Sequence, residues 1–210
     1  MFYIQYILLI IICYLIGSVP TAYVILKKRH GKDIRNEGTG NVGAMNSFDV
    51  SGSKSTGIIV FILDFLKGAI PSFVLAYIFR FPLELIVIPI LAVVVGHNFS
   101  IWLKFKGGRG LATAAGIAMA INFWLLIIWC VVYFLTFLIN KNVHIDSIAA
   151  TIFLPVGLVL AKSIVIKFGY IADENSFDML FTLCSLLCLL ILIKHIKPTI
   201  ELITNKRKTE

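Results

Sequence analysis

The chain has 210 residues, of which 59% are hydrophobic and 14% are charged, and its formal net charge is +8. Soluble domains are usually about 45–50% apolar and about 25% charged, so this composition excludes a chain built mainly from a soluble domain. It predicts an all-α fold, a polytopic bundle of membrane helices, in which apolar runs of about 20 residues cross the bilayer.

Six apolar runs follow one another along the chain, at residues 2–26, 57–78, 83–96, 111–139, 148–166 and 177–193. The first is long and lacks a basic beginning, which favours a membrane span over a cleaved signal peptide. The fourth has about 30 residues and, at about 1.5 Å per residue, is longer than a bilayer core is thick. It is either one tilted helix or two short helices that turn near Asn122.

The basic residues distinguish between these alternatives. With two helices in the fourth run, residues 27–56, 97–110, 140–147 and 194–210 lie on one side of the membrane, and they carry 15 of the 19 basic residues. With one helix, the basic tail would move to the other side. The positive-inside rule therefore predicts seven transmembrane helices, with the N-terminus outside and the C-terminus cytoplasmic. A basic face of this kind suits anionic lipid headgroups better than it suits nucleic acid.

The first polar segment, residues 35–46, reads Arg-Asn-Glu-Gly-Thr-Gly-Asn-Val-Gly-Ala-Met-Asn. Its glycines match the G-x-G-x-x-G pattern, but a dinucleotide site also needs a preceding strand, and here the neighbours are membrane helices. Glycines let backbone N–H groups approach an anion closely, and successive N–H groups form a nest for phosphate. The segment is therefore a candidate phosphate-binding loop, with a plain glycine-rich turn as the alternative.

The second polar segment, residues 97–110, ends in Lys106-Gly-Gly-Arg-Gly110 just before the fourth apolar run. A helix N-terminus offers unpaired N–H groups and a partial positive charge, so cations and glycines placed there predict an oxyanion or phosphate site. His97 comes nine residues before Lys106 on the same predicted side. An imidazole there could orient a hydroxyl, take its proton or bond a phosphate oxygen; a structural histidine is the alternative.

Asp64 and Lys67 lie one turn apart within the second apolar run. Ionisable groups at that depth are costly and usually face the bundle interior or a wet cavity, and two residues at this spacing can neutralise each other. We expect a structural pair that faces the interior, with a direct substrate role as the alternative.

The four cysteines, Cys13, Cys130, Cys184 and Cys188, all fall in apolar runs. This placement argues against a disulfide framework. Cys184 and Cys188 share a helical face, but small buried core residues are favoured there over a metal site. The pattern of cysteines and histidines predicts no metal ligands.

Several segments together resemble the bacterial acyl-phosphate:glycerol-3-phosphate acyltransferase family, the PlsY type. The resemblance rests on residues 17–20 (Gly-Ser-Val-Pro), 33–35, 38–46, 63–68 (Leu-Asp-Phe-Leu-Lys-Gly), 96–97 and 105–110 (Phe-Lys-Gly-Gly-Arg-Gly). It implies one integral membrane acyltransferase domain, residues 1–210, in the bacterial inner membrane. It also implies transfer of a fatty acyl group from acyl phosphate to the 1-hydroxyl of glycerol 3-phosphate. The product would be lysophosphatidic acid, and neither acyl-CoA nor a metal or other cofactor would be needed.

The resemblance and the chemistry of the two polar segments predict a joint site for two phosphate esters. Since an acyl phosphate carries a good leaving group, positioning and charge neutralisation suffice without a covalent enzyme intermediate. The predicted catalytic residues are His97, which positions the attacking hydroxyl, and Lys106, Asn41 and Thr39. The predicted phosphate-binding residues are Arg35, Gly38, Gly40, Gly43, Asn46, Gly107, Gly108 and Arg109.

The chain differs from the family pattern at several positions. Thr39 stands in place of serine, Met45 of threonine, Asp49 of a basic residue, Ser100 of proline and Arg109 of lysine, and the tail 195–205 does not match the family's third motif. Two other functions are compatible with the sequence: an anion or lipid transporter, and an inactive member that binds lipid precursors. A transport site, however, belongs near the bilayer midplane, whereas both polar segments are predicted at one face.

Overall fold

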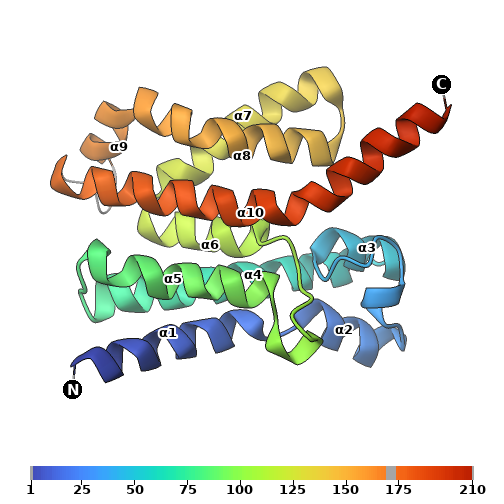
Figure 1. Ribbon diagram of the computed structural model, residues 1–210, viewed down its shortest axis with the longest axis horizontal. Helices are drawn as coiled ribbons and strands as arrows, with labels where there is room; N and C mark the ends of the chain where they lie inside the picture. The colour runs from blue at the N-terminus through green and yellow to red at the C-terminus, as the bar shows by residue number, and fades with distance from the viewer. Residues whose placement is uncertain (1, 169–173, 210) are drawn as a thin grey trace. The chain divides into compact units, whose positions relative to one another are not determined.

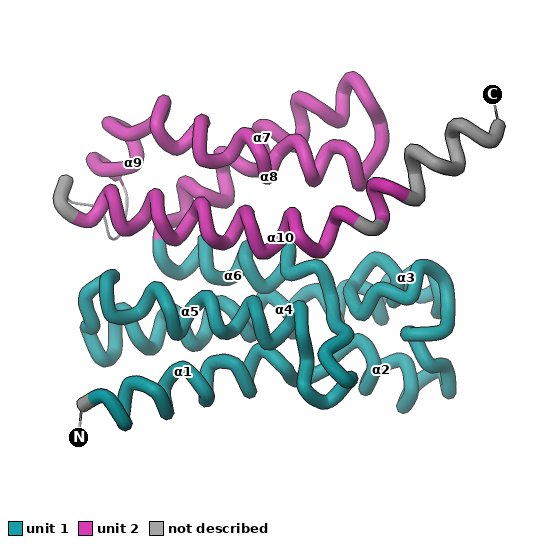
Figure 2. Tube along the Cα trace, in the orientation of Figure 1, with its two compact units in different colours: residues 1–121 teal, residues 122–210 magenta. Residues whose placement is uncertain are grey.

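The computed structural model describes residues 2–168 and 174–209, and every regular element in these ranges is helical. The chain divides into two compact units, Met1–Ile121 and Asn122–Glu210 (Figure 2). The first unit contains α1 (Phe2–Ser18), α2 (Thr21–His30), η1 (Ile34–Asn36), α3 (Ala44–Ser51), α4 (Lys54–Phe73), η2 (Val74–Ile78), α5 (Leu83–Asn98), η3 (Ile101–Leu103) and α6 (Leu111–Ile121) (Figure 1). The second contains α7 (Phe123–Asn140), α8 (Val143–Leu160), α9 (Lys162–Phe168) and α10 (Glu174–Thr209).

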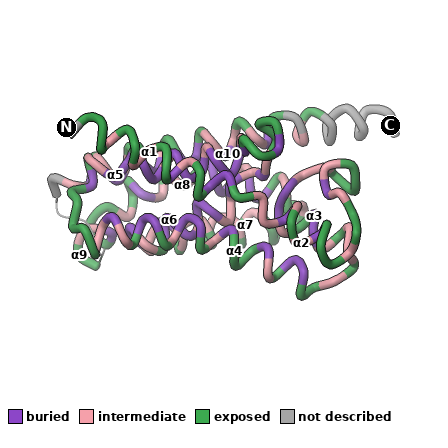
Figure 3. The backbone as a smooth tube through the Cα atoms, turned by 90° about the horizontal axis from the view of Figure 1, so that it is seen from below, coloured by how far each residue is buried: buried purple, intermediate pink, exposed green. Residues whose placement is uncertain are grey.

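Within the described residues, six helical segments are long and apolar enough to cross a membrane: Tyr3–His30, Lys54–Ile78, Leu83–Leu103, Phe123–Asn140, Val143–Leu160 and Ser176–Ile196. Much of their surface is apolar, as the exposed positions along α1 illustrate (Figure 3), where Ile7 and Ile12 are 56% and 53% exposed. An apolar exterior of this kind suits contact with lipid chains. The protein is therefore a multi-pass membrane protein. Helix α6, at 11 residues, is shorter than these six, so the seventh span stays a prediction.

The fourth apolar run consists of two helices, as the distribution of basic residues predicted. α6 ends at Ile121 and α7 begins at Phe123. Between them Asn122 has an extended backbone, and its side-chain oxygen accepts a hydrogen bond from the backbone N–H of Trp124 at 3.1 Å. An asparagine in this position satisfies an N–H group that the first turn of a helix leaves unpaired, so the break is encoded locally.

The first apolar run is not one continuous helix. α1 ends at Ser18 and α2 begins at Thr21, because Pro20 has no N–H group and its ring cannot follow a preceding helical turn. The run at 148–166 is similarly divided, between α8 and α9. The break after Ser18 leaves backbone carbonyl groups unpaired by the helix. One side chain from α4 and one from the loop after α5 bind two of these groups in the candidate site.

Glycines set the close packing of helices in the first unit. A Cβ atom on Gly17 of α1 would overlap the backbone of α5, and one on Gly96 of α5 would overlap the backbone of α1. Gly68 of α4 and Gly116 of α6 have the same reciprocal relationship. Small residues at such crossings allow membrane helices to approach closely. The two crossings fix the position of α5 against α1 and of α4 against α6. Helix α4 carries Lys67 and helix α5 carries His97.

A small hydrophobic core lies beneath the two polar segments. Its buried members come from α2, η1, the loop before α3, α4 and η3, and they are Ala22, Leu26, Ile34, Val42, Val60 and Leu103. Val42 belongs to the first polar segment and Leu103 to the second, so burial of these side chains holds the two segments together.

The second unit is built on the packing of α8 against α7 and α10. Its α7–α8 turn is closed by Asp146, which is fully buried and accepts hydrogen bonds from the Asn140 side chain and the Asn142 backbone at 3.2 and 2.9 Å. These bonds satisfy a carboxylate that would otherwise be costly to bury.

Candidate active site

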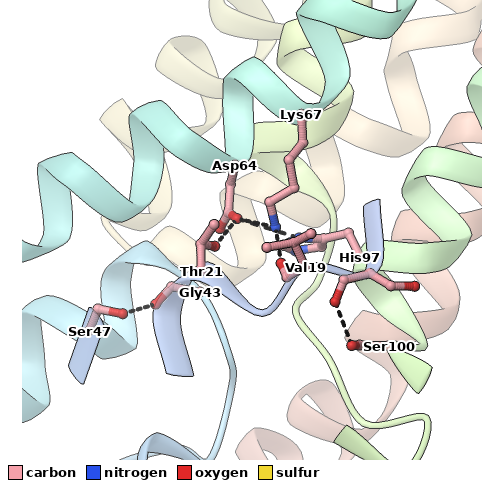
Figure 4. Close-up of polar contacts among 9 residues, drawn as sticks. Val19, Thr21, Gly43, Ser47, Asp64, Lys67, His97 and Ser100 are labelled. Carbon is pink, nitrogen blue, oxygen red and sulfur yellow. Dashed lines mark hydrogen bonds and ion pairs between the residues drawn. The ribbon is translucent and has the colours of Figure 1, made fainter. Parts of the chain in front are cut away.

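A buried ion pair lies at the centre of the first unit. Nζ of Lys67 is 2.8 Å from Oδ1 of Asp64, and the two residues are 9% and 1% exposed. The hydroxyl group of Thr21 donates a hydrogen bond to the same carboxylate oxygen, and Nδ1 of His97 is 3.7 Å from it (Figure 4). The expectation of a pair that faces the interior is confirmed, and the structure adds His97 and Thr21 to its surroundings.

Side chains from α4 and from the loop after α5 bind the carbonyl groups at the break between α1 and α2. Nζ of Lys67 donates to the Val19 carbonyl oxygen at 2.7 Å, and Oγ of Ser100 donates to the Ser18 carbonyl oxygen at 2.6 Å (Figure 4). Ser100 is the residue that stands in place of the family's proline. Its hydroxyl group ties the second polar segment to the end of α1.

His97 lies at the end of α5 and is covered by the glycine pair of the second polar segment. The Gly108 N–H donates to the His97 carbonyl oxygen at 3.0 Å. A Cβ atom on Gly108 would overlap Nε2 of His97 and would lie 2.8 Å from the Val42 carbonyl oxygen, while one on Gly107 would overlap the His97 carbonyl oxygen. Only residues without a side chain fit there. His97, the glycine pair and the first polar segment therefore meet at one place.

A small pocket opens at this meeting point. Its walls include Thr21, Val42, Lys67, His97, Gly107 and Gly108. The pocket is thus bordered by an ammonium group, an imidazole and two glycines, which is a combination suited to an oxygen-rich, anionic group.

Asn46 shapes the first polar segment from within. It is 2% exposed, and its Oδ1 accepts from the Thr39 N–H at 2.9 Å. Its Nδ2 donates to the carbonyl oxygens of Glu37 and Asn41 at 3.1 and 3.0 Å. Gly38 has a left-handed backbone with φ of 56°, and a Cβ atom there would overlap Oδ1 of Asn46. The amide of Asn46 is therefore directed at the loop itself.

Arg35 forms an ion pair with Asp33, a residue for which the sequence predicted no role. Its Nε and Nη2 donate to the two carboxylate oxygens of Asp33 at 2.9 and 2.6 Å, and its guanidinium lies 4.9 Å from the centre of the Tyr23 ring. The hydrogen bonds with Arg35 lower the pKa of Asp33 to about 2, and those with Asp33 raise the pKa of Arg35. The spacing Asp-x-Arg was the available signal, because an aspartate often bonds to the backbone two residues later, as Asp33 does here.

The other predicted residues lie at the surface or at helix starts. Thr39 is exposed and its hydroxyl oxygen accepts from the Asn41 N–H at 3.4 Å. Gly43 is buried and precedes α3, where its carbonyl oxygen accepts from the Ser47 hydroxyl at 2.9 Å. Lys106 is exposed and Arg109 is half-buried. Gly40, with φ of 67°, has the left-handed backbone that glycine tolerates best.

The fold and the site define a multi-pass helical membrane protein with a polar site where two glycine-rich segments meet a buried Asp–Lys pair. Comparisons with known proteins give the family. A sequence model of the family described as glycerol-3-phosphate acyltransferase matches residues 7–205. A glycerol-3-phosphate acyltransferase of Endomicrobium trichonymphae is 38% identical over 206 residues, which cover 95% of this chain and 94% of the relative. One of Pelagibacter ubique (strain HTCC1062) is 36% identical over 159 residues, 76% of this chain and 81% of the relative.

Two solved structures are also similar. The crystal structure of PlsY (YgiH), an integral membrane glycerol 3-phosphate acyltransferase, in its glycerol 3-phosphate form gives a TM-score of 0.79 at 33% identity, over 96% of this chain and 93% of that one. Its lysophosphatidic acid form gives a TM-score of 0.77 at 31% identity over the same shares. The chain belongs to the glycerol-3-phosphate acyltransferase family and is an acyltransferase, as the resemblance predicted.

Proposed function

We propose that this protein transfers a fatty acyl group from acyl phosphate to the 1-hydroxyl of glycerol 3-phosphate, with lysophosphatidic acid and inorganic phosphate as products. One observation carries the proposal most directly: the glycine pair 107–108 closes on His97 beside Val42. This contact joins two loops that each suit a phosphate group, and both substrates, glycerol 3-phosphate and acyl phosphate, carry one. The family match over residues 7–205 supports one functional domain over residues 1–210.

The reaction needs no covalent enzyme intermediate. The oxygen of the 1-hydroxyl forms a bond to the carbonyl carbon of the acyl phosphate, and the bond between that carbon and the phosphate oxygen breaks. The hydroxyl proton ends on the released phosphate, so atoms and charge balance. Since the mixed anhydride is already activated, the protein contributes by orientation and by charge neutralisation.

The predicted residues divide between these two tasks. His97 positions the attacking hydroxyl, because its imidazole is buried at the pocket and its ring lies between Asp64 and Gly108. Lys106 and Arg109 neutralise phosphate charge in the loop just before α6, beside the backbone of Gly107. The Gly108 N–H is already bonded to the His97 carbonyl oxygen. A histidine in this position can also accept the hydroxyl proton transiently, before the proton reaches the released phosphate.

The first polar segment forms the second phosphate loop. Gly38, Gly40 and Gly43 let its backbone approach an anion, Arg35 adds charge, and the polar groups of Thr39 and Asn41 orient the substrate. Asn46 stabilises the conformation of the same loop, because its side chain forms hydrogen bonds with the backbone of residues 37–41.

The proposal includes a topology of seven membrane spans in the bacterial inner membrane, with the N-terminus outside. α6 then forms a short span, and both polar segments face the cytoplasm together with 15 of the 19 basic residues. The break at Asn122 supports this count, because it divides the fourth apolar run into two helices, as the distribution of basic residues requires.

The test uses the purified full-length protein in detergent with radiolabelled glycerol 3-phosphate and one donor at a time, palmitoyl phosphate or palmitoyl-CoA. We expect labelled lysophosphatidic acid from the acyl phosphate and little from the thioester. His97→Ala and Lys106→Ala variants with unchanged thermal unfolding should lose at least about 100-fold in rate, within the usual range for positioned acid–base and charged groups. A folded wild-type protein that makes product only from the thioester would overturn the proposed donor.

A further inference from the structure

Lys67 is a buried cation in the middle of a membrane-crossing segment. It is 9% exposed and lies in α4, within the span Lys54–Ile78. A charged group at such depth is costly and usually marks a functional site. Asp64 neutralises it, yet a buried ion pair is often no more stable than two well-packed apolar residues. A contribution to the stability of the fold therefore does little to explain why this ion pair is present.

The ammonium group of Lys67 has three N–H donors, and two acceptors are found for them among the described residues. A lysine ammonium carries three N–H donors and no acceptor. Among the described residues, Nζ donates to Oδ1 of Asp64 at 2.8 Å and to the Val19 carbonyl oxygen at 2.7 Å. The two bonds fix the position of the ammonium group, and one N–H is left for a third acceptor.

Lys67 borders the small pocket, where such an acceptor would bind. Lys67 forms part of its wall together with His97, Gly107 and Gly108. The carboxylate of Asp64 is already engaged by Lys67 and by the Thr21 hydroxyl. The strongest donor at the pocket is therefore a preoriented cation that stands beside the imidazole proposed to position the attacking hydroxyl.

We propose that Lys67 binds a substrate oxyanion in this pocket, and that Asp64 and Val19 are positioning residues that hold its ammonium group in place. The inference rests on the proposed function and adds to it a contact from within the membrane span. The bound oxyanion is a phosphate oxygen, and it belongs either to glycerol 3-phosphate or to the acyl phosphate. Because both substrates carry phosphate oxygens, separate kinetic constants distinguish the sources.

The main test variant is Asp64→Asn combined with Lys67→Met, which removes both charges and leaves no buried carboxylate unpaired. Steady-state kinetics give kcat and the KM values for both substrates. A charge-assisted hydrogen bond contributes enough to predict a roughly 10- to 100-fold loss in kcat/KM. If Lys67 binds the acceptor, the KM for glycerol 3-phosphate rises; if it binds the donor, the KM for acyl phosphate rises.

A second variant covers the case in which the double variant does not fold. Lys67→Arg keeps the charge but places a larger planar group in the pocket, and it should raise the same KM by about tenfold. Ser72→Ala is the control, because Ser72 is a buried residue of α4 whose hydroxyl bonds to the Gly68 carbonyl within the helix. It should leave both KM values unchanged.

Folded Lys67 variants with kcat and both KM values within twofold of wild type would overturn the inference, even if their thermal unfolding midpoint falls. Lys67 would then only clamp the break at Val19. This outcome is distinct from failure of the proposed function, in which the wild-type protein itself forms no lysophosphatidic acid.

Discussion

Gly108 and His97 touch so closely that no side chain fits between them: a Cβ atom on Gly108 would overlap Nε2 of the imidazole. Gly108→Ala must therefore displace either the ring or the loop. Since a displacement of about 1 Å can cost about 100-fold in rate, we expect a loss of about that size in kcat/KM for acyl transfer.

The matched control is Gly31→Ala. Gly31 has a left-handed backbone, and a Cβ atom there would meet no neighbouring atom within 4 Å, so its replacement strains the chain without touching the site. This variant should be less stable, by about 1–2 kcal/mol, and should keep its rate once folded. Equal rates for the two glycine variants would contradict the role given to the contact with His97.

Replacement of Asn46 should reveal its role within the first polar segment. Asn46→Asp exchanges the amide donor for an oxygen that faces the Glu37 and Asn41 carbonyl oxygens, whereas Asn46→Ala only removes the bonds. Each lost bond leaves a buried group unsatisfied at a cost of about 1–3 kcal/mol. We expect the thermal unfolding midpoint to decrease in the order wild type, Asn46→Ala, Asn46→Asp. An aspartate variant as stable as wild type would argue against the loop contacts.

The ion pair of Asp33 and Arg35 has a predictable dependence on pH. The bonds from Arg35 lower the folded-state pKa of Asp33 from 3.8 to about 2, so the pair stabilises the fold fully above pH 3.8 and loses its contribution as the pH falls toward 2. The difference in unfolding midpoint between wild type and Asp33→Asn should be constant from pH 8 to about pH 5. A difference that shrinks already between pH 7 and pH 5 would show that the carboxylate is not held in this way.

The sequence predicted those features that depend on local composition. Apolar runs located the membrane helices, and an asparagine within the longest run located its break, because an amide that caps a helix acts on residues next to it. The prediction of two phosphate-binding loops rests on glycines and cations that are adjacent in the chain.

Contacts that depend on the folded path of the chain were beyond such reasoning. The resemblance predicts Asn46 as a phosphate-binding residue, and only the folded loop shows that its amide also bonds to the backbone of residues 37–41. The binding of Lys67 to Val19 depends on how α4 packs beside a proline break 48 positions away in the chain. No local sequence pattern indicates a contact between residues so far apart in the chain.

Topology can be tested by cysteine labelling in a variant whose four native cysteines are replaced. With seven spans, a cysteine at Lys141 lies in the cytoplasm and one at Arg80 lies outside. A membrane-impermeant maleimide added to intact cells should then label position 80 and spare position 141 until the cells are opened. Labelling of both positions in intact cells would mean that α6 does not cross the membrane.

The most direct measurement is the stoichiometry of the reaction catalysed by the purified protein. With acyl phosphate and glycerol 3-phosphate as the only substrates, mass spectrometry and a phosphate assay should find one lysophosphatidic acid for each inorganic phosphate released. Phosphate release without lysophosphatidic acid, or no release from a folded protein, would contradict acyl transfer to glycerol 3-phosphate.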